Sequence, residues 1–375
     1  MKRIRLLRIG GHPLRYAGQF NLASMLTRMS SDIEVVTIDP PYYRWKFAER
    51  MGRLWCQYVT PLGPRFRPHV VLTDDTGFAS VRWLRRWLKC PVMYIWYDDF
   101  LDMRTFRPRW FPPTPKNLLE RVKADNYREA DVLLVGSQET FRTGGQLRGS
   151  SEGIFYLPVS VNTERFDPDK YDAETVQCHW GLAANIVIGY VGRICSDPTN
   201  PNNFAGKPLV LAAEKIVQAN PKVRFLILGW GPAMPLFKEW VRKLGLTDYF
   251  VFPGYVPDEE YPTYLKAFDI AVATLDDNYV SRTRSATKVK EYLAMGRAIV
   301  ATGIGENVKD LAQGEAGLLA RPDNSDLAER ILDLVTNVQL RERLGQRARE
   351  RALKVYSDSV LARKMEQIIR QTVST

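Results

Sequence analysis

Short apolar runs alternate with longer segments of helical periodicity along the chain. The runs have strand length, and segments such as Leu209–Ala219 and Pro235–Leu244 repeat apolar residues at helical spacing. This alternation predicts parallel sheets with crossover helices, an α/β fold class. The strands predicted in the first half are Ile4–Ile9, Glu34–Ile38, Val70–Leu72, Val92–Trp96, Val132–Val135 and Ile154–Leu157. Those predicted in the second half are Val187–Val191, Arg224–Leu228, Phe250–Phe252, Ile270–Ala273, Ala298–Ala301 and Gly317–Leu319.

The length of the chain and one polar stretch predict two domains. A chain of 375 residues suits two domains of ordinary size better than one. The stretch Phe166–Val176 has no apolar period and is the predicted boundary. We therefore expect two doubly wound, Rossmann-like domains over residues 1–168 and 177–355, followed by a helical segment over residues 356–375.

The composition is that of a packed globular protein, with 45% hydrophobic and 25% charged residues. No stretch approaches the roughly 18 apolar residues that span a bilayer. Met1–Arg8 begins with basic residues but lacks the apolar segment of a signal peptide, so we interpret it as a first strand and expect a cytoplasmic protein. The cysteines Cys56, Cys90, Cys178 and Cys195 lack C-x-x-C spacing, which disfavours a zinc site and a disulfide framework.

The net charge of +11 lies in the first part of the chain. Residues 1–150 hold 25 Lys and Arg against 14 Asp and Glu, and the remainder of the chain is balanced. Such asymmetry indicates an anionic partner, which can be membrane lipid, a polyanionic acceptor or nucleic acid. A basic surface without a specific partner is the alternative.

One predicted helix, Ser80–Lys89, combines aromatic and basic residues on opposite arcs. A surface of this kind suits the headgroup zone of a membrane. The alternative is a crossover helix whose apolar face covers the sheet and whose basic face lies in water. The apolar arc consists of Val81, Trp83, Leu84, Trp87 and Leu88, and the basic arc of Arg82, Arg85, Arg86 and Lys89.

Two cations in the second half lie at the ends of predicted elements. Arg193 follows the strand Val187–Val191, at the edge where doubly wound folds bind ligands, and Lys207 opens a helical segment after a polar loop. A pyrophosphate that leaves with additional charge needs cations and helix N-termini around it. The two residues therefore predict a diphosphate site, although each cation alone also fits an ordinary surface position.

A carboxylate and free backbone N–H groups complete this pattern. Glu291 is predicted to start a helix, and its carboxylate can accept hydrogen bonds from vicinal ribose hydroxyls. Stabilisation of the helix dipole is the alternative role for Glu291. Just upstream, the N–H groups of Ser285, Ala286 and Thr287 suit phosphate oxygens.

Several segments of the second half have the sequence and spacing of one enzyme family. Their combination resembles the retaining GT-B glycosyltransferases of family 4. The resemblance covers nearly the whole chain and is strongest over residues 155–325. The matching segments are Gly192-Arg193 with Lys207, Phe225–Pro232, Phe252–Val256, Lys288 with Glu291–Gly296, and Leu157–Phe166, which is similar to the family's interdomain signature.

The resemblance implies two Rossmann-like domains that face a cleft, with a C-terminal helix that crosses back to the first domain. It implies transfer of a hexose from a UDP- or GDP-sugar to a glycan or lipid-linked acceptor, with retention and without a metal or other cofactor. By position, Arg193 and Lys207 would stabilise the departing diphosphate and Glu291 would bind the ribose. The backbone of Tyr255 and Val256 would contact the base.

One departure from the family pattern concerns the donor sugar. The family often has Glu-x7-Glu, and its first Glu contacts the sugar, but Thr283 stands at that position here. Some relatives share the Lys-x-x-Glu form, so activity is still expected. Lys288 is expected near the phosphate, where it would compensate.

The other departure lies in the first domain. Tyr97 stands where the family commonly has His, and Asp98 and Asp99 follow it. These carboxylates would bind acceptor hydroxyls or assist proton transfer, with Asp98 as the catalytic candidate, unless they cap a helix. Gly11 permits close backbone approach to the donor, or only a tight turn. His12, Tyr97 and Asp99 join Thr283 as candidates for acceptor or sugar contacts.

We therefore predict a glycosyltransferase of cell-surface polysaccharide or glycolipid synthesis. Its basic first domain would recruit it to the inner face of the cytoplasmic membrane. A non-catalytic partner protein with the same fold and a sugar-nucleotide epimerase are the alternatives. A nucleic-acid binder is disfavoured because no nucleic-acid motif accompanies the basic residues.

Overall fold

The computed structural model describes residues 3–9, 30, 32–38, 66–74, 80–96, 124–196 and 204–374. The chain divides into two compact units, each built from segments distant in the sequence. Unit 1 consists of Met1–Ser160, Thr283–Ser285 and Asp358–Thr375, and unit 2 of Val161–Arg282 and Ala286–Ser357.

Unit 1 contains a six-stranded parallel sheet in the order β2-β1-β3-β4-β5-β6. Successive side chains of a strand point to opposite faces, so Leu6 and Leu7 of β1 enter different cores, and both faces are covered. The strands are β1 (Ile4–Ile9), β2 (Ile33–Ile38), β3 (Val70–Asp74), β4 (Val92–Trp96), β5 (Val132–Val135) and β6 (Ile154–Tyr156). The helices named in unit 1 are α4 (Val81–Leu88), α6 (Gln138–Arg148) and α16 (Asp358–Ser374).

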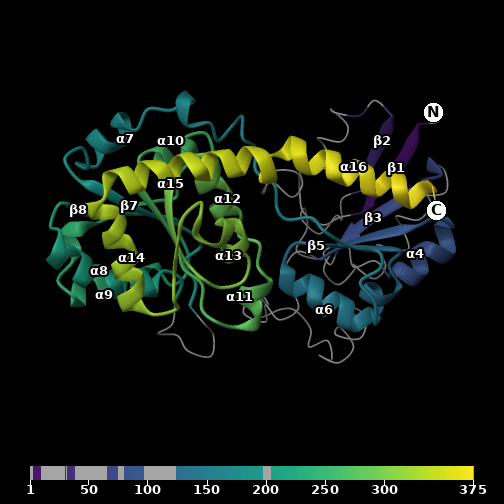
Figure 1. Cartoon of the computed structure of the whole chain (residues 1–375), viewed down its shortest axis with the longest axis horizontal. Coiled ribbons are helices and arrows are strands. Elements are labelled where there is room, and N and C mark those ends of the chain that lie inside the picture. The colour runs from purple at the N-terminus through teal and green to yellow at the C-terminus, as the bar shows by residue number, and fades with distance from the viewer. Residues whose placement is uncertain are drawn as a thin grey trace. The chain divides into compact units, whose positions relative to one another are not determined.

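Helix α16 completes one face of the sheet in unit 1 (Figure 1). Its residues Leu361, Met365 and Ile369 recur at helical spacing and are buried against Leu6 and Val70 of the strands. The last helix of the chain therefore belongs to the unit that the first strand begins.

Unit 2 contains a second six-stranded parallel sheet, in the order β12-β11-β10-β7-β8-β9. The chain runs outward from β7 to β9 and returns to continue from β10 to β12, so β7 and β10 lie at the point where the strand order reverses. Doubly wound sheets bind ligands beyond the carboxyl ends of the strands at this point. The strands are β7 (Ile186–Val191), β8 (Val223–Leu228), β9 (Phe250–Gly254), β10 (Ile270–Ala273), β11 (Ala298–Thr302) and β12 (Leu318–Ala320).

Helices cover both faces of the sheet in unit 2, and each face has its own apolar core. The α-helices are α7 (Glu174–His179), α8 (Lys207–Ala219), α9 (Met234–Lys243), α10 (Tyr261–Lys266), α11 (Tyr279–Thr283), α12 (Thr287–Ala294), α13 (Glu306–Asp310), α14 (Asn324–Thr336) and α15 (Val338–Arg351). Short 3₁₀ turns cover Pro168–Lys170, Thr247–Tyr249 and Ala312–Gly314, and a π-helical turn, Ala352–Tyr356, follows α15.

The predicted strands agree with the observed ones to within two residues at their ends. The predicted domain limits differ from the observed units. The sequence places the boundary at the polar stretch Phe166–Val176, whereas unit 2 already begins at Val161. Val161 and Phe166 are buried in a core of unit 2, and a core contact outweighs local polarity. None of the helices in the described ranges has the length and apolar character of a membrane span.

Candidate functional site

The carboxyl end of β7 is held rigidly against the turn that follows β8. Gly192 N donates to the carbonyl of Leu228 at 3.0 Å, and Ile194 N donates to the carbonyl of Trp230 at 3.0 Å. A Cβ atom on Gly229 would lie 1.9 Å from the Gly192 carbonyl oxygen, so only glycine allows this approach. The two backbones thus continue side by side beyond the strands.

This contact brings Arg193 and Trp230 together. The guanidinium carbon of Arg193 lies 5.5 Å from the centroid of the Trp230 ring, which is 57% exposed. The expected diphosphate residue Arg193 is therefore exposed at the carboxyl end of β7, which is the position predicted from the sequence.

Lys207 is the first residue of α8, and the chain returns to β7 before this helix begins. An antiparallel bridge joins Ser196 to Phe204, and Ala205 N donates to the carbonyl of Cys195 at 2.9 Å. The Lys207 ammonium lies 4.7 Å from the centroid of Trp240 on α9. The loop closure therefore brings the start of α8 back to the segment that carries Arg193.

Lys288 is a third cation at the same strand end. Its Nζ atom donates to the carbonyl of Val191 at 2.9 Å and lies 4.3 Å from the centroid of Tyr190. A Cβ atom on Gly192 would lie 3.6 Å from this ammonium. Lys288 thus lies directly beside the backbone that leads to Arg193.

Glu291 does not start a helix, in contrast to the sequence prediction. Helix α12 begins at Thr287 and is preceded by Ala286, whose side chain cannot cap it. Glu291 therefore lies inside the helix, so the alternative role of an N-terminal carboxylate that stabilises the dipole is wrong. The prediction failed because the true helix start carries none of the usual capping residues.

The carboxylate of Glu291 has a partner that the sequence does not reveal. Tyr261 on α10 donates its hydroxyl to Oε2 of Glu291 at 2.7 Å. Burial raises the pKa of Glu291 above its ordinary value, while the Tyr261 hydrogen bond and the charge of Arg165 oppose this shift. Burial and the nearby Glu291 charge also raise the pKa of Tyr261, so its hydroxyl keeps its proton.

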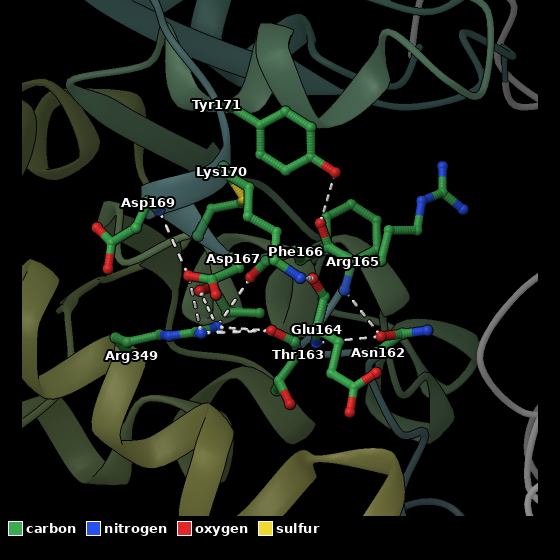
Figure 2. Close-up of polar contacts among 12 residues, drawn as sticks. Asn162, Thr163, Glu164, Arg165, Phe166, Asp167, Asp169, Lys170, Tyr171 and Arg349 are labelled. Carbon is green, nitrogen blue, oxygen red and sulfur yellow. Dashed lines mark hydrogen bonds and ion pairs between the residues drawn. The ribbon is translucent and has the colours of Figure 1, made fainter.

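Arg349 on α15 fixes the segment with which unit 2 begins (Figure 2). Its guanidinium donates to the carbonyls of Phe166 and Ala294, each at 2.8 Å, and to that of Thr163 at 3.3 Å. It also forms an ion pair with Asp167 at 3.2 Å. Because Ala294 ends α12, Arg349 ties the helix of Lys288 and Glu291 to this segment.

The expected base-contacting residues follow β9, which neighbours β8 in the sheet. Gly229 N donates to the carbonyl of Gly254 at 3.2 Å, so the turn after β8 and the end of β9 are in contact. Tyr255 is 72% exposed, and Val256 packs partly into a core of unit 2. Tyr255 and Val256 therefore follow the strand that neighbours the one leading to Trp230.

The other predicted residues of the second half differ in exposure. Thr283 ends α11 and is fully buried. Ser285 is buried too, and its Oγ accepts a hydrogen bond from Val159 N at 3.4 Å within unit 1. Ala286 and Thr287 are partly exposed at the start of α12, where backbone N–H groups lack helical partners. The predicted residues Gly11, His12, Tyr97, Asp98 and Asp99 lie outside the described residues.

Helix α4 divides its predicted apolar arc between core and solvent. Val81 and Leu84 are buried against the sheet, which agrees with a crossover helix. Trp87 is 47% exposed and stacks on Trp83 with their centroids 5.8 Å apart. The basic arc is partly neutralised, because Arg82 pairs with Glu129 and Arg85 with Asp131, while Arg86 and Lys89 are exposed.

Sequence comparison finds a family model that covers this site and curated relatives that align with part of the chain. A family model described as glycosyl transferases group 1 matches residues 185–337. A 2-deoxystreptamine glucosyltransferase of Streptomyces kanamyceticus is 26% identical over 212 residues, which are 55% of this chain and 52% of the relative. A GDP-mannose-dependent phosphatidylinositol monomannoside mannosyltransferase of Mycolicibacterium smegmatis is 25% identical over 158 residues, 42% of this chain and 39% of the relative. The chain thus spans about half the length of the curated relatives it matches.

Structure comparison extends over the whole chain. Anabaena HepE in complex with UDP and glucose matches with a TM-score of 0.73 at 16% identity, over 98% of this chain and 100% of that one. Sucrose-phosphate synthase from Thermosynechococcus elongatus matches with a TM-score of 0.73 at 17% identity, over the full length of both chains. At such low identity these matches show the fold alone, a GT-B arrangement of two parallel six-stranded sheets with helices. The family model matches residues 185–337, the segment that carries the cations around β7.

Proposed function

We propose that the protein transfers a hexose from a nucleoside-diphosphate sugar to a glycan or lipid-linked acceptor. The observation that carries this proposal is the set of cations around the carboxyl end of β7. Lys288 contacts Val191, Arg193 follows two residues later, and the loop closure returns Lys207 to the same segment. The topology of the sheet independently marks this end of β7 as a ligand position.

The chemistry of the site follows from the charge that develops during transfer. When the bond between the sugar and the diphosphate breaks, the leaving diphosphate gains negative charge. Cations held near that charge stabilise the transition state more than the ground state, and this difference accelerates the reaction. In this mechanism Arg193, Lys207 and Lys288 bind the diphosphate oxygens, and the N-terminus of α8 adds backbone N–H groups.

The nucleoside is bound by residues on the neighbouring elements. Oε2 of Glu291 is engaged by Tyr261, which leaves its other carboxylate oxygen to accept a hydrogen bond from a ribose hydroxyl. In this mechanism the exposed Tyr255 and the backbone at Val256 contact the base. Relatives named for glucosyl and GDP-mannose-dependent mannosyl transfer support a hexose donor.

The proposal includes retention of configuration and catalysis without a metal ion. Retention rests on the family resemblance of the motifs around Arg193 and Glu291. Metal-free catalysis rests on cations that already supply the charge a divalent ion would bring. Product configuration by proton NMR tests the former, and turnover that persists in EDTA tests the latter.

The proposal also includes reversible binding to the cytoplasmic membrane through the basic first part of the chain. On α4, the exposed Trp87 next to Arg86 and Lys89 supports it, since an aromatic ring flanked by cations suits the headgroup zone. The enzyme would then meet a lipid-linked acceptor at the surface of the membrane that holds it.

The decisive experiment is a donor screen with the purified full-length chain. UDP-, GDP- and ADP-sugars are incubated with it, thermal shift reports binding, and chromatography identifies the released sugar and nucleotide. We expect one donor to raise the melting temperature and to release its nucleoside diphosphate slowly, as water takes the place of the acceptor and receives the sugar. Binding without turnover would favour a non-catalytic protein, conversion to an isomeric nucleotide sugar would favour an epimerase, and no binding at all would overturn the proposal.

A further inference from the structure

Each cation at the carboxyl end of β7 lies on the face of an aromatic ring. Arg193 lies 5.5 Å from the ring centroid of Trp230, Lys207 lies 4.7 Å from that of Trp240, and Lys288 lies 4.3 Å from that of Tyr190. The rings come from three different elements of unit 2, namely the turn after β8, helix α9 and strand β7. The same type of contact therefore recurs at all three proposed phosphate ligands.

The rings are held more firmly than the cations that rest on them. Tyr190 is buried inside β7, and Trp240 packs against the core of unit 2. Trp230 is exposed, but its backbone is fixed by the close contacts of the glycines on either side, since a Cβ on Gly231 would lie 2.1 Å from the Ile194 carbonyl oxygen. Long, flexible side chains are thereby restrained by rigid partners.

An aromatic ring restrains a cation without cancelling its charge. The attraction comes from the ring quadrupole, whereas a carboxylate would neutralise the cation and compete with an incoming phosphate. Among the residues that the structure describes, neither Lys207 nor Lys288 forms an ion pair. Both lysines are therefore positioned without a carboxylate in direct contact, so their charge can attract an anion.

We propose that Trp230, Trp240 and Tyr190 are positioning residues that hold Arg193, Lys207 and Lys288 ready for a diphosphate. This inference rests on the proposed function, because it assigns the anion as the diphosphate of the donor. Preorganised charge costs less reorganisation during binding and reaction than charge on free side chains. The rings act only through the cations, so their effect is confined to ligands that carry phosphate.

The test uses the full-length chain and the pair Lys207 and Trp240. Dissociation constants of UDP, GDP, uridine and guanosine are measured by titration calorimetry for the wild type, Trp240→Leu, Trp240→Phe, Lys207→Ala and the double variant Lys207→Ala/Trp240→Leu. We expect Trp240→Leu to weaken diphosphate binding about three- to tenfold and to leave nucleoside binding unchanged. Phe retains a ring face and restores most of the affinity, and Trp240→Leu adds no further loss once Lys207 is absent.

Matched controls separate positioning from folding. Trp180→Leu alters a partly buried tryptophan of the same unit whose indole N–H donates to Tyr264 instead of carrying a cation, and it should leave all four affinities unchanged. If Trp240→Leu lowers the melting temperature strongly, the same cycle with Arg193 and the exposed Trp230 replaces it.

The outcomes are distinct. An equal loss for diphosphates and nucleosides means that the ring stacks on the base, and an undiminished loss in the Lys207→Ala background means that it acts independently of the lysine; either overturns the inference. Wild-type protein that binds none of the nucleoside diphosphates UDP, GDP and ADP overturns the proposed function itself. Wild-type binding that Trp240→Leu does not weaken overturns the positioning role alone.

Discussion

The hydroxyl of Tyr261 on α10 donates a 2.7 Å hydrogen bond to the carboxylate of Glu291 on α12, and strand β10 separates the two helices in the sequence. This bond favours the charged form of Glu291, against the burial that raises its pKa. Arg165 and Lys288 also favour the charged form, whereas Asp258 opposes it. The ionisation of the proposed ribose ligand is thus set by several neighbours.

We predict that Tyr261→Phe shifts the acid limit of donor binding to higher pH. Without the hydroxyl, the pKa of Glu291 rises further. As the pH falls, Glu291 is therefore protonated at a higher pH than in the wild type, and its contact with the ribose is lost there. The measurement is the dissociation constant of the diphosphate nucleotide from pH 5 to pH 8 for both proteins. Parallel curves for variant and wild type would show that Tyr261 does not act through Glu291.

We predict that Glu291→Gln stabilises the fold near neutral pH and lowers the affinity for the donor. A carboxyl group whose pKa is raised by folding binds more protons in the native state, so its contribution to stability falls as pH rises from the unfolded value through the folded one. Replacement by a neutral amide removes that cost, and the melting temperature should rise by about 2 °C at pH 8. The gain should shrink below pH 4, where the carboxyl group is protonated in both states; a gain independent of pH would contradict the assignment.

We predict that Arg193→Ala lowers kcat/KM about 100- to 1000-fold without unfolding the protein. The substitution removes a positive charge that, in the proposed mechanism, stabilises the leaving diphosphate. Arg224→Ala is the matched control. Arg224 also lies on an aromatic ring, 5.1 Å from the Tyr249 centroid, but near the amino end of β8, so its removal should leave turnover within about threefold. Equal effects of the two substitutions would show that the charge at the end of β7 has no special role.

We predict that replacing only one residue of the buried ion pair Lys290–Asp310 destabilises the fold more than replacing both. Both side chains are 0% exposed, and their charged atoms lie 2.5 Å apart. Lys290→Met leaves a buried carboxylate without its cation and should lower the free energy of unfolding by about 3–5 kcal/mol. The double variant Lys290→Met/Asp310→Leu should recover most of that loss in denaturant titrations; a double variant as unstable as the single one would argue against the pair.

We predict that the exposed side chains of Arg86 and Trp87 on α4 mediate membrane binding. The double variant Arg86→Ala/Trp87→Ser should sediment less with vesicles that contain phosphatidylserine than the wild type does, and added salt should weaken the wild-type binding. Arg82→Ala removes one positive charge that already pairs with Glu129, so it should have a smaller effect. Equal sedimentation with anionic and neutral vesicles would exclude recruitment by charge.

Much of the fold was predictable because parallel strands buried on both faces leave continuous apolar runs in the sequence. The positions of Arg193 and Lys207 in the fold were predictable for a related reason, since the end of a strand and the start of a helix are visible locally. The contact between Tyr261 and Glu291 was not, because it joins different helices and Tyr261 fits an ordinary apolar helix position. Nor did the sequence indicate that Trp230 and Trp240 would carry cations, because each of these contacts joins residues that are more than 30 positions apart in the chain.

Helix α16 has a consequence for the order in which the chain becomes stable. Its apolar residues Leu361, Met365 and Ile369 cover strands that are synthesised well before the helix itself, including β1. A nascent chain that has left the ribosome only as far as Ser357 contains all of unit 2 and can fold it. At that stage one apolar face of the sheet in unit 1 is still exposed. Until α16 is synthesised, this apolar face therefore stays without the helix that buries it in the native protein, and such exposed surface favours aggregation.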